Sequence, residues 1–395
     1  MKDYSKLQFL HFFRYLGDAL FYAFLTIYFK SLNFSDLELG TLLAVIPLTA
    51  IIGSLVLSKL SGNQHRNIIM LKVVNVVEAI FMIFFGFFTS FVPILIFDII
   101  VAFCNKAYYS LLESIAIDVS KSANKNYSNI RIFGSIAYLI SSFFGGYLIE
   151  FFNYKYVFII ASCLYLISNL FILFIKSDKK DNVIEKDSVK IVDIFKNKSF
   201  CFYLLFYIFA LGASNVSDNI FALYVSDLGM NQANYGMVFS MEVLFEIICM
   251  FIVSKVIKKD KYKLVLICSA ILICLRNVLF AIPMPLIALD IIASLRGIAW
   301  GSMLAVHLNY FSSIVKKEYL TKSIFALNIF LQIFNALFNQ FGPKISSYSY
   351  SLMFSLLALF SIIGLIMLIF VKQSNLDTNC DKLITEQNNL EDKLC

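Results

Sequence analysis

Long apolar stretches follow one another along almost the whole chain, and only short polar loops separate them. Each stretch is about as long as the roughly 20-residue helix that crosses the hydrocarbon core of a bilayer. None shows the strict alternation of a membrane β-barrel. We therefore predict an all-α integral membrane fold with twelve transmembrane helices, at 7–30, 38–58, 68–90, 92–118, 127–150, 154–176, 200–225, 234–257, 262–283, 286–312, 320–341 and 348–371.

The longest polar stretch between spans follows the sixth span and divides the chain into two halves. We expect a six-helix bundle over 1–176, a cytoplasmic linker over 177–199 and a second six-helix bundle over 200–371. The polar tail, 372–395, is expected to be disordered. Two six-helix pseudo-repeats are typical of secondary transporters, whose substrate site lies between the halves near mid-bilayer. The linker is interpreted as solvated, with a binding segment as the alternative.

Composition agrees with the apolar pattern: 60% of the residues are hydrophobic and 15% charged, whereas soluble domains carry roughly 25% charged residues. The net charge of +7 does not indicate nucleic-acid binding, because Lys and Arg gather in alternate loops. These basic loops are 59–66, 121–125, 176–198, 255–263 and 316–322, and the opposite loops hold Lys30, Lys155 and Lys344. Basic loops stay in the cytoplasm, so we expect a multi-pass plasma-membrane protein with both termini cytoplasmic.

The cysteines and the loops argue against metal and enzyme chemistry. The eight cysteines are scattered, without CxxC or metal-ligand spacing, so we expect neither a metal nor a cofactor. No loop between spans forms a soluble domain or carries a His/Asp/Cys cluster, so we do not expect an enzyme. A transporter-like receptor that binds without transporting remains an alternative. We expect a monomer.

Several ionisable residues fall near the middle of predicted spans, where a charge is costly and usually functional. At about 1.5 Å of rise per residue, five of them lie midway through a core of roughly 30 Å. They are Asp18, Glu78, Glu246, Arg276 and Arg296. Because both halves contribute, we expect these side chains to meet around one shared polar cavity.

Simpler interpretations stay open for some of these charges. Arg14 and Asp18 are four residues apart and can pair along one helix face. Lys106 can serve as a counter-ion to Glu78 or Asp98. Asp98 and Asp290 lie within about two turns of the outer surface, so contact with water explains them.

A pair of carboxylates in the second half suits proton binding, and three glycines in the first half favour close helix packing. Glu242 and Glu246 are four residues apart on one helix face. Two carboxylates this close in a low dielectric favour retention of a proton by one of them, as a proton carrier requires. Gly17 and the pair Gly145–Gly146 permit neighbouring helices to approach closely.

The segment YSNIRIFGSIAYLISSFFGGYLIEF, 127–151, resembles the start of helix five in the lactose-permease-like branch of the major facilitator superfamily, which includes oligosaccharide:proton symporters and phenylpropionate-permease-like proteins. The resemblance implies that Glu113 and Arg131 hold the substrate and that Tyr138 stacks on it. A carboxylate and a guanidinium form charge-assisted hydrogen bonds, and an aromatic face suits an apolar sugar face or another ring.

In the second half, MVFSMEVLFEIICMF is similar to the helix-eight motif of that branch, with a glutamate at Glu246, and LICLRNVLF places its helix-nine arginine at Arg276. Asp218 falls where the sugar symporters have an aspartate in helix seven. Arg296 falls where they have a histidine, which implies a role in substrate binding. The acid that carries the proton in helix ten would lie at Ala299, which cannot titrate.

The resemblance thus implies a proton-coupled symporter of the major facilitator fold that imports a sugar, a nucleoside or an aromatic acid. Coupling would then be relocated to Glu242 and Glu246 with Arg276 and Asp218, while Asp18, Glu78 and Lys106 are candidates for the central cavity. The missing acid at Ala299 keeps an uncoupled facilitator or an exporter as the alternative.

Overall fold

The computed structural model describes residues 3–60, 64–123, 128–173 and 191–372, which form helices and contain no strand. The first half of the chain consists of α1 (Asp3–Tyr22), α2 (Leu25–Ser31), α3 (Asp36–Leu60), α4 (Gln64–Phe85), α5 (Phe91–Ser122) and α6 (Ser128–Leu173). The second half consists of η1 (Ile191–Lys196), α7 (Lys198–Phe206), η2 (Tyr207–Leu211), α8 (Gly212–Asp227), α9 (Gln232–Val256), η3 (Lys259–Lys261), α10 (Tyr262–Phe280), α11 (Leu286–Ala293), α12 (Leu295–Ser312), η4 (Lys317–Tyr319), α13 (Leu320–Tyr348) and α14 (Tyr350–Phe370).

The twelve predicted spans are confirmed. Ten stretches of the described residues are long and apolar enough to cross a membrane, and one of them, 130–173, contains two predicted spans. Within it Asn153 has a left-handed φ of 60° and separates two helices. The first predicted span is formed by α1 and α2, whose polar residues keep it outside those ten. Counting α6 as two helices and adding this span gives twelve.

Polar caps fix where several of these helices begin. The Asn197 side chain accepts a hydrogen bond from the backbone N–H of Phe200 at the start of α7. Asn231 does the same at the start of α9, and Ser349 at the start of α14. Such caps satisfy backbone donors that have no partner inside the helix.

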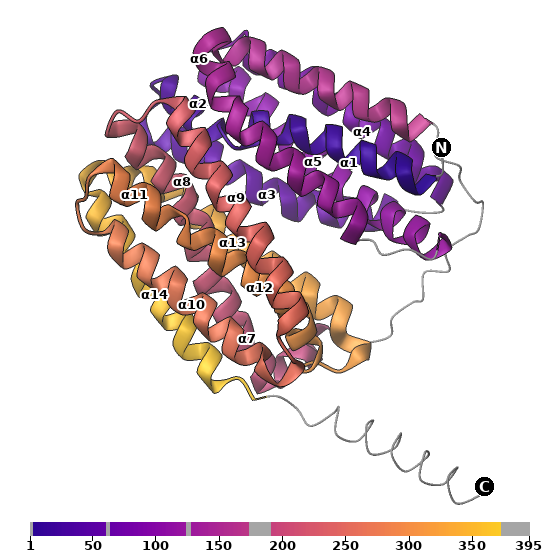
Figure 1. The fold of residues 1–395 in the computed structure, drawn as a ribbon, viewed down its shortest axis with the longest axis vertical. Coiled ribbons are helices and arrows are strands. Elements are labelled where there is room, and N and C mark those ends of the chain that lie inside the picture. The colour runs from indigo at the N-terminus through magenta and orange to yellow at the C-terminus, as the bar shows by residue number, and fades with distance from the viewer. Residues whose placement is uncertain (1–2, 61–63, 124–127, 174–190, 373–395) are drawn as a thin grey trace, which may run out of the picture.

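The two halves lie side by side and form a V (Figure 1). They are in contact at the end where α2, α8 and α11 lie, and they diverge toward the end with the N-terminus and α7. We call these the closed end and the open end. Helices of different halves pack through α3 on α13, α6 on α9 and α2 on α8. Any opening between the halves therefore faces the open end.

Polar contacts tie the halves together at the closed end. Lys30 pairs with Asp227 at 3.0 Å, and the Thr26 hydroxyl donates to Asn219 at 3.0 Å. The Glu150 carboxylate accepts the backbone N–H of Ala233 at 3.0 Å. These contacts join α2 to α8 and α6 to α9 at their closed ends.

Two glycines let the backbones of opposite halves approach closely. A Cβ on Gly146 of α6 would lie 2.0 Å from the carbonyl oxygen of Gln232, and one on Gly40 of α3 would lie 2.0 Å from that of Gln340. Within one half, a Cβ on Gly17 would lie 2.6 Å from the Tyr165 ring. The close approach predicted at Gly17 and Gly146 is confirmed.

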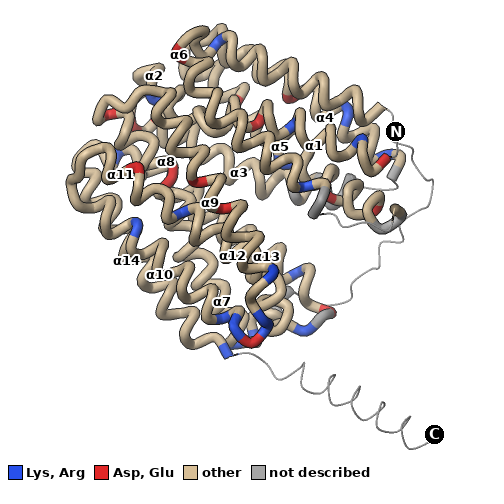
Figure 2. Tube along the Cα trace, in the orientation of Figure 1, with Lys and Arg blue, Asp and Glu red and all other residues tan. Residues whose placement is uncertain are grey.

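The predicted domain boundaries stay predictions. Most of the 177–199 linker falls in 174–190, outside the described residues, and so does the 372–395 tail apart from Lys372. Lys and Arg positions are concentrated at the open end of the second half and are sparse at the closed end (Figure 2).

Candidate functional site

A cavity of about 210 Å³ lies between the halves on the side of the open end. Its walls come from α3 and α5 of the first half and from α13 of the second. Most of its polar lining consists of Lys106, Tyr109, Ser110 and Glu113 on α5 and Asn328 and Gln332 on α13. A space of this kind, apolar with a few convergent polar groups, is typical of a small-molecule site.

Glu113 and Arg131 come together beside this cavity. The two side chains are 3.6 Å apart and about half exposed, at 51% and 44%. Arg131 also donates a hydrogen bond to the Tyr15 hydroxyl at 3.2 Å, and the Tyr15 ring packs edge-on against Tyr109 of the cavity wall. The pair predicted to hold the substrate is thus accessible. Its role stays a prediction.

Tyr138 lies at the boundary between the halves. Its ring centroid is 6.0 Å from that of Phe239 on α9. It is within electrostatic range of Asp18 in its own half and of Arg296 and Glu246 in the other. A stacking role against a bound solute is compatible with this place, but it too stays a prediction.

Four charged residues of the second half form a closed ring. Arg276 of α10 pairs with Asp218 of α8 at 2.9 Å and with Glu242 of α9 at 3.9 Å. Arg296 of α12 pairs with the same two carboxylates, at 2.5 Å and 3.4 Å. Two positive and two negative charges thus compensate one another, as a largely buried ionic group requires.

Glu246 stands next to this ring without belonging to it. It is within electrostatic range of Arg296, Arg131 and Asp218, yet among the described residues no cation lies within the 4.0 Å of an ion pair. Glu246 is therefore the acid of this region whose charge is least compensated.

The helix that carries Glu246, α9, packs tightly on α12. A Cβ on Gly297 would lie 2.0 Å from the Glu242 carbonyl oxygen, and a Cβ on Gly301 would lie 2.2 Å from the Glu246 carbonyl oxygen.

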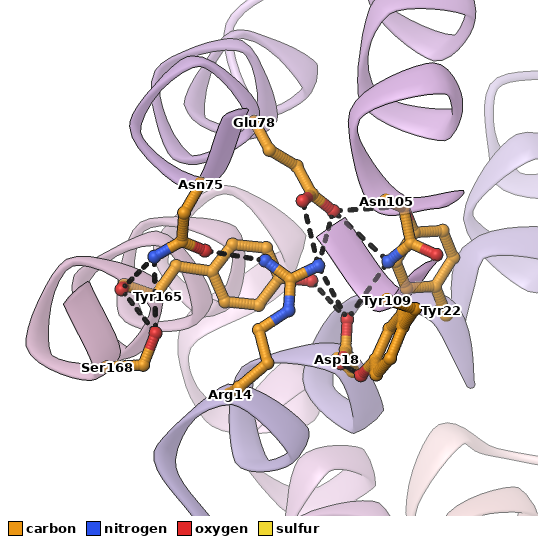
Figure 3. Close-up of polar contacts among 9 residues, drawn as sticks. All are labelled: Arg14, Asp18, Tyr22, Asn75, Glu78, Asn105, Tyr109, Tyr165 and Ser168. Atoms are coloured by element: carbon orange, nitrogen blue, oxygen red, sulfur yellow. Dashed lines mark hydrogen bonds and ion pairs between the residues drawn. The ribbon is translucent and has the colours of Figure 1, made fainter. Parts of the chain in front are cut away.

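A second ionic network lies inside the first half (Figure 3). Arg14 of α1 donates to both carboxylate oxygens of Glu78 on α4, at 2.8 Å each, and to Asn75 at 2.8 Å. The guanidinium carbon is 3.6 Å from the centroid of the Tyr165 ring and 4.1 Å from that of Tyr108. A bidentate carboxylate and two ring faces are strong partners for a guanidinium.

Asp18 completes this network one turn along α1 from Arg14. Its carboxylate accepts hydrogen bonds from the hydroxyls of Tyr109 and Tyr165 and from the Asn105 amide, the last at 3.3 Å. It also lies 3.4 Å from Arg14. The local Arg14–Asp18 pair thus exists, but Arg14 is closer to Glu78.

We expected all the mid-span charges to meet around one cavity. This is wrong for the charges that form buried ion pairs, because these pairs lie inside one half or the other. Each buried ion pair among the described residues joins helices of the same half. Asp18 and Glu78 do not line the cavity between the halves, whereas Lys106 does. The reason is that each half forms its own helical bundle, and desolvated charges find partners inside it.

The sequence argument missed the uncharged members of these networks. Asn75, Asn105, Tyr109 and Tyr165 bind the charged groups directly. Asparagines inside apolar spans were the available signal. The G-x-x-x-G spacing of Gly297 and Gly301 was the signal for the α9–α12 approach. The described ranges contain no group of three or more His, Cys, Asp or Glu side chains placed to hold a metal ion.

Comparison with known proteins identifies relatives over nearly the whole chain. Residues 4–334 match the MFS_1 like family. The chain is 23% identical over 374 residues to the uncharacterized transporter YwbF of Bacillus subtilis (strain 168), covering 92% of this chain and 91% of that one.

Solved structures share the fold. The nucleoside transporter NupG superposes with a TM-score of 0.76 at 15% identity, over 94% of this chain and 99% of that one. A bacterial homologue of the human lysosomal transporter Spinster, inward-facing and occupied, superposes with a TM-score of 0.65 at 12% identity, over 93% of each chain.

Proposed function

This chain belongs to the MFS_1 like family, and on that premise we propose that it is a secondary active transporter that imports a small polar solute together with a proton. The fold and the relatives are those of transporters of the major facilitator type. The solute, the direction and the coupling ion are the parts of the proposal that follow from the site.

One observation carries the proposal: the accessible Glu113–Arg131 pair beside a cavity whose walls come from both halves. A solute bound there would contact both halves at once, as alternating access requires. A carboxylate and a guanidinium can together hold hydroxyl groups, and aromatic Tyr138 and Tyr109 can pack on a ring. Sugars, nucleosides and aromatic acids fit this chemistry, and the fold shared with a nucleoside transporter makes nucleosides the first class to test.

The distribution of charge supports an inward-facing state. The basic loops around 59–66, 255–263 and 316–322 follow or precede helix ends at the open end, and basic loops are cytoplasmic. The open end would then face the cytoplasm of a plasma membrane, with both termini there and the closed end outside. The cavity would release solute to the cell in this state.

Glu246 is the proposed proton carrier. In the ring of Asp218, Glu242, Arg276 and Arg296, each carboxylate is paired with two guanidinium groups. Glu246 lies beside it, half-buried and without an ion pair in the described part of the chain. When the halves rock, a change in its distance to Arg131 of the other half would bind or release the proton.

A thermal-shift screen of the purified protein against sugars, nucleosides and aromatic acids tests the binding site. A bound solute stabilises the folded state by mass action. We expect the hit to be lost in Arg131→Ala and retained in Lys344→Ala, which removes an exposed lysine near the closed end. A hit that survives Arg131→Ala would place the site elsewhere.

Uptake into proteoliposomes tests the coupling. With an inward proton gradient, we expect Glu246→Gln to abolish uphill accumulation and to leave solute exchange across the membrane. Uphill uptake by this variant would show that another group carries the proton.

A second candidate function is uncoupled transport. The position that carries the acid in the sugar symporters is Ala299 here, 1% exposed and packed among apolar side chains. A protonophore distinguishes the two functions. It should stop the uphill uptake of a proton-coupled transporter and leave the downhill flux of an uncoupled one unchanged.

A further inference from the structure

Asp98 lies alone in the interior of the first half. It is on α5, only 1% exposed, and one of its carboxyl oxygens is buried without a hydrogen-bond partner in the described part of the chain. The expectation that it reaches water is therefore wrong. Asp290, grouped with it in that expectation, is partly exposed.

The cations of the first half that could balance Asp98 are engaged elsewhere. Arg14 pairs with Glu78 and Asp18. Lys106 is within electrostatic range of Asp18, Glu113 and Glu78 but not of Asp98. Of the described side chains on α1, α3 and α4, no charged group acts appreciably on Asp98, and the titratable group that senses it is the Tyr22 hydroxyl.

An isolated carboxylate cannot stay ionised in such surroundings. Transferring it from water into an apolar interior is so unfavourable that the group takes up a proton instead. We propose that Asp98 is a proton-binding site of the first half, separate from Glu246 and loaded from the closed end. The inference does not depend on which solute is transported, nor on the role of Glu246.

The position of Asp98 indicates the side from which the proton comes. Asp98 lies about two turns from Phe91, where α5 begins at the closed end, and Phe91 packs edge-on against Phe34 of the loop before α3. On the side of the open end, Glu78 accepts hydrogen bonds from the hydroxyl of Tyr22 at 3.3 Å and from the amide of Asn105 at 3.2 Å. These bonded groups block a path from the open end to Asp98. The closed end is therefore the nearer side for a proton, and loosening that end would ease its access to Asp98.

Tyr22 also connects this site to the ionic network. Its hydroxyl donates to Glu78 and is within electrostatic range of Asp98. A proton held at Asp98 can therefore influence the Arg14–Glu78–Asp18 group without a direct contact. This gives the first half a response to protons from the outside face.

Infrared spectroscopy of the full chain in lipid nanodiscs at neutral pH tests the site. The difference spectrum between wild type and Asp98→Asn should show the loss of one carbonyl band of a protonated carboxylic acid. Asp98→Glu should shift this band. Asp260→Asn, the same substitution in an exposed carboxyl, should leave the band in place.

The proposal is wrong if Asp98→Asn removes the bands of an ionised carboxylate instead. This result would leave Glu246 untouched as the coupling acid. Conversely, a failure of Glu246→Gln to abolish uphill uptake would not affect the infrared band of Asp98. The two assignments can therefore fail separately.

Hydrogen–deuterium exchange of the same band tests the route. Asp227→Ala removes the partner of Lys30 and of the Tyr350 hydroxyl at the closed end, and we expect it to speed exchange several-fold. Glu113→Gln at the open end should leave the rate unchanged. Faster exchange in Glu113→Gln alone would show that the proton enters from the open end and would overturn the proposed loading.

Discussion

Arg14 is surrounded by a carboxylate pair, an amide and two aromatic rings, and only its Nε is buried without a hydrogen-bond partner in the described part of the chain. It is fully buried, its guanidinium binds both oxygens of Glu78, and the rings of Tyr165 and Tyr108 cover its faces. Such an arrangement is stable only when complete, because removing one partner leaves an uncompensated charge in a low dielectric.

We predict that Arg14→Leu destabilises the protein by about 3–5 kcal/mol, because Glu78 and Asp18 then remain buried without their cation. Thermal melting in detergent measures this. Lys196→Ala is the control, since Lys196 pairs with Asp193 on the surface and such surface pairs contribute about 0–1 kcal/mol. Equal melting temperatures for the two variants would mean that the network contributes little.

Sequence reasoning located the charged residues better than it chose their partners. The depth of Glu78 or Arg276 follows from counting residues along an apolar run, since the rise per residue is fixed. Pairing depends on the direction of each side chain and on which helix packs opposite it. The sequence of a single span determines neither. Arg14 therefore pairs with Glu78, 64 positions away, as well as with the predicted Asp18.

At the scale of elements, α9 and α12 form the contact that holds the second ionic group. Gly297 and Gly301 on α12 face the carbonyl oxygens of Glu242 and Glu246 on α9. The backbones can meet because neither glycine carries a Cβ. Arg296, next to Gly297, is thereby brought to Glu242 and Asp218.

Gly297→Ala should separate α9 from α12, because its Cβ would lie 2.0 Å from a backbone oxygen that cannot rotate away. We expect a clear fall in melting temperature and loss of uphill uptake. Gly53→Ala is the matched control, since its Cβ would meet atoms no nearer than 3.6 Å. Wild-type stability of Gly297→Ala would contradict the close approach.

Some helix boundaries followed from the sequence, but α13 continues to Tyr348, past the predicted end at 341, through polar residues. The break between the fifth and sixth spans was placed correctly, and Asn153, a residue that tolerates a positive φ, lies there. The π-helical turn at Tyr207–Leu211 in the seventh span was not foreseen. Its residues are as apolar as the helix around them, so periodicity carries no signal for it.

For the whole molecule, the closed end determines which side the cavity faces. Gly146 of α6 lies against the Gln232 backbone of α9, while Lys30 and Asp227 join α2 to α8 nearby. The two-half architecture was foreseen from the polar stretch in mid-chain. The V was not, because counting residues along apolar runs gives no information on how the two halves are oriented.

Gly146→Leu should shift the population toward a state open at the closed end. Its side chain would overlap the Gln232 carbonyl, whose Cβ contact is already 2.0 Å, so the contact between α6 and α9 must loosen. Spin labels at positions 30 and 227, in a background without native cysteines, should report a longer distance than in the parent. An unchanged distance would mean that α6 and α9 do not control this end.

The exact compensation within the Asp218–Glu242–Arg276–Arg296 ring has an electrical consequence. Moving one elementary charge through the membrane potential changes the energy by about 2.3 kcal/mol per 100 mV, but a group with no net charge experiences no such force. The membrane potential would thus exert no net force on the ring as the second half rocks. Any current that accompanies a neutral solute must then come from protons bound outside the ring, so a count of charges per solute would report the coupling stoichiometry directly.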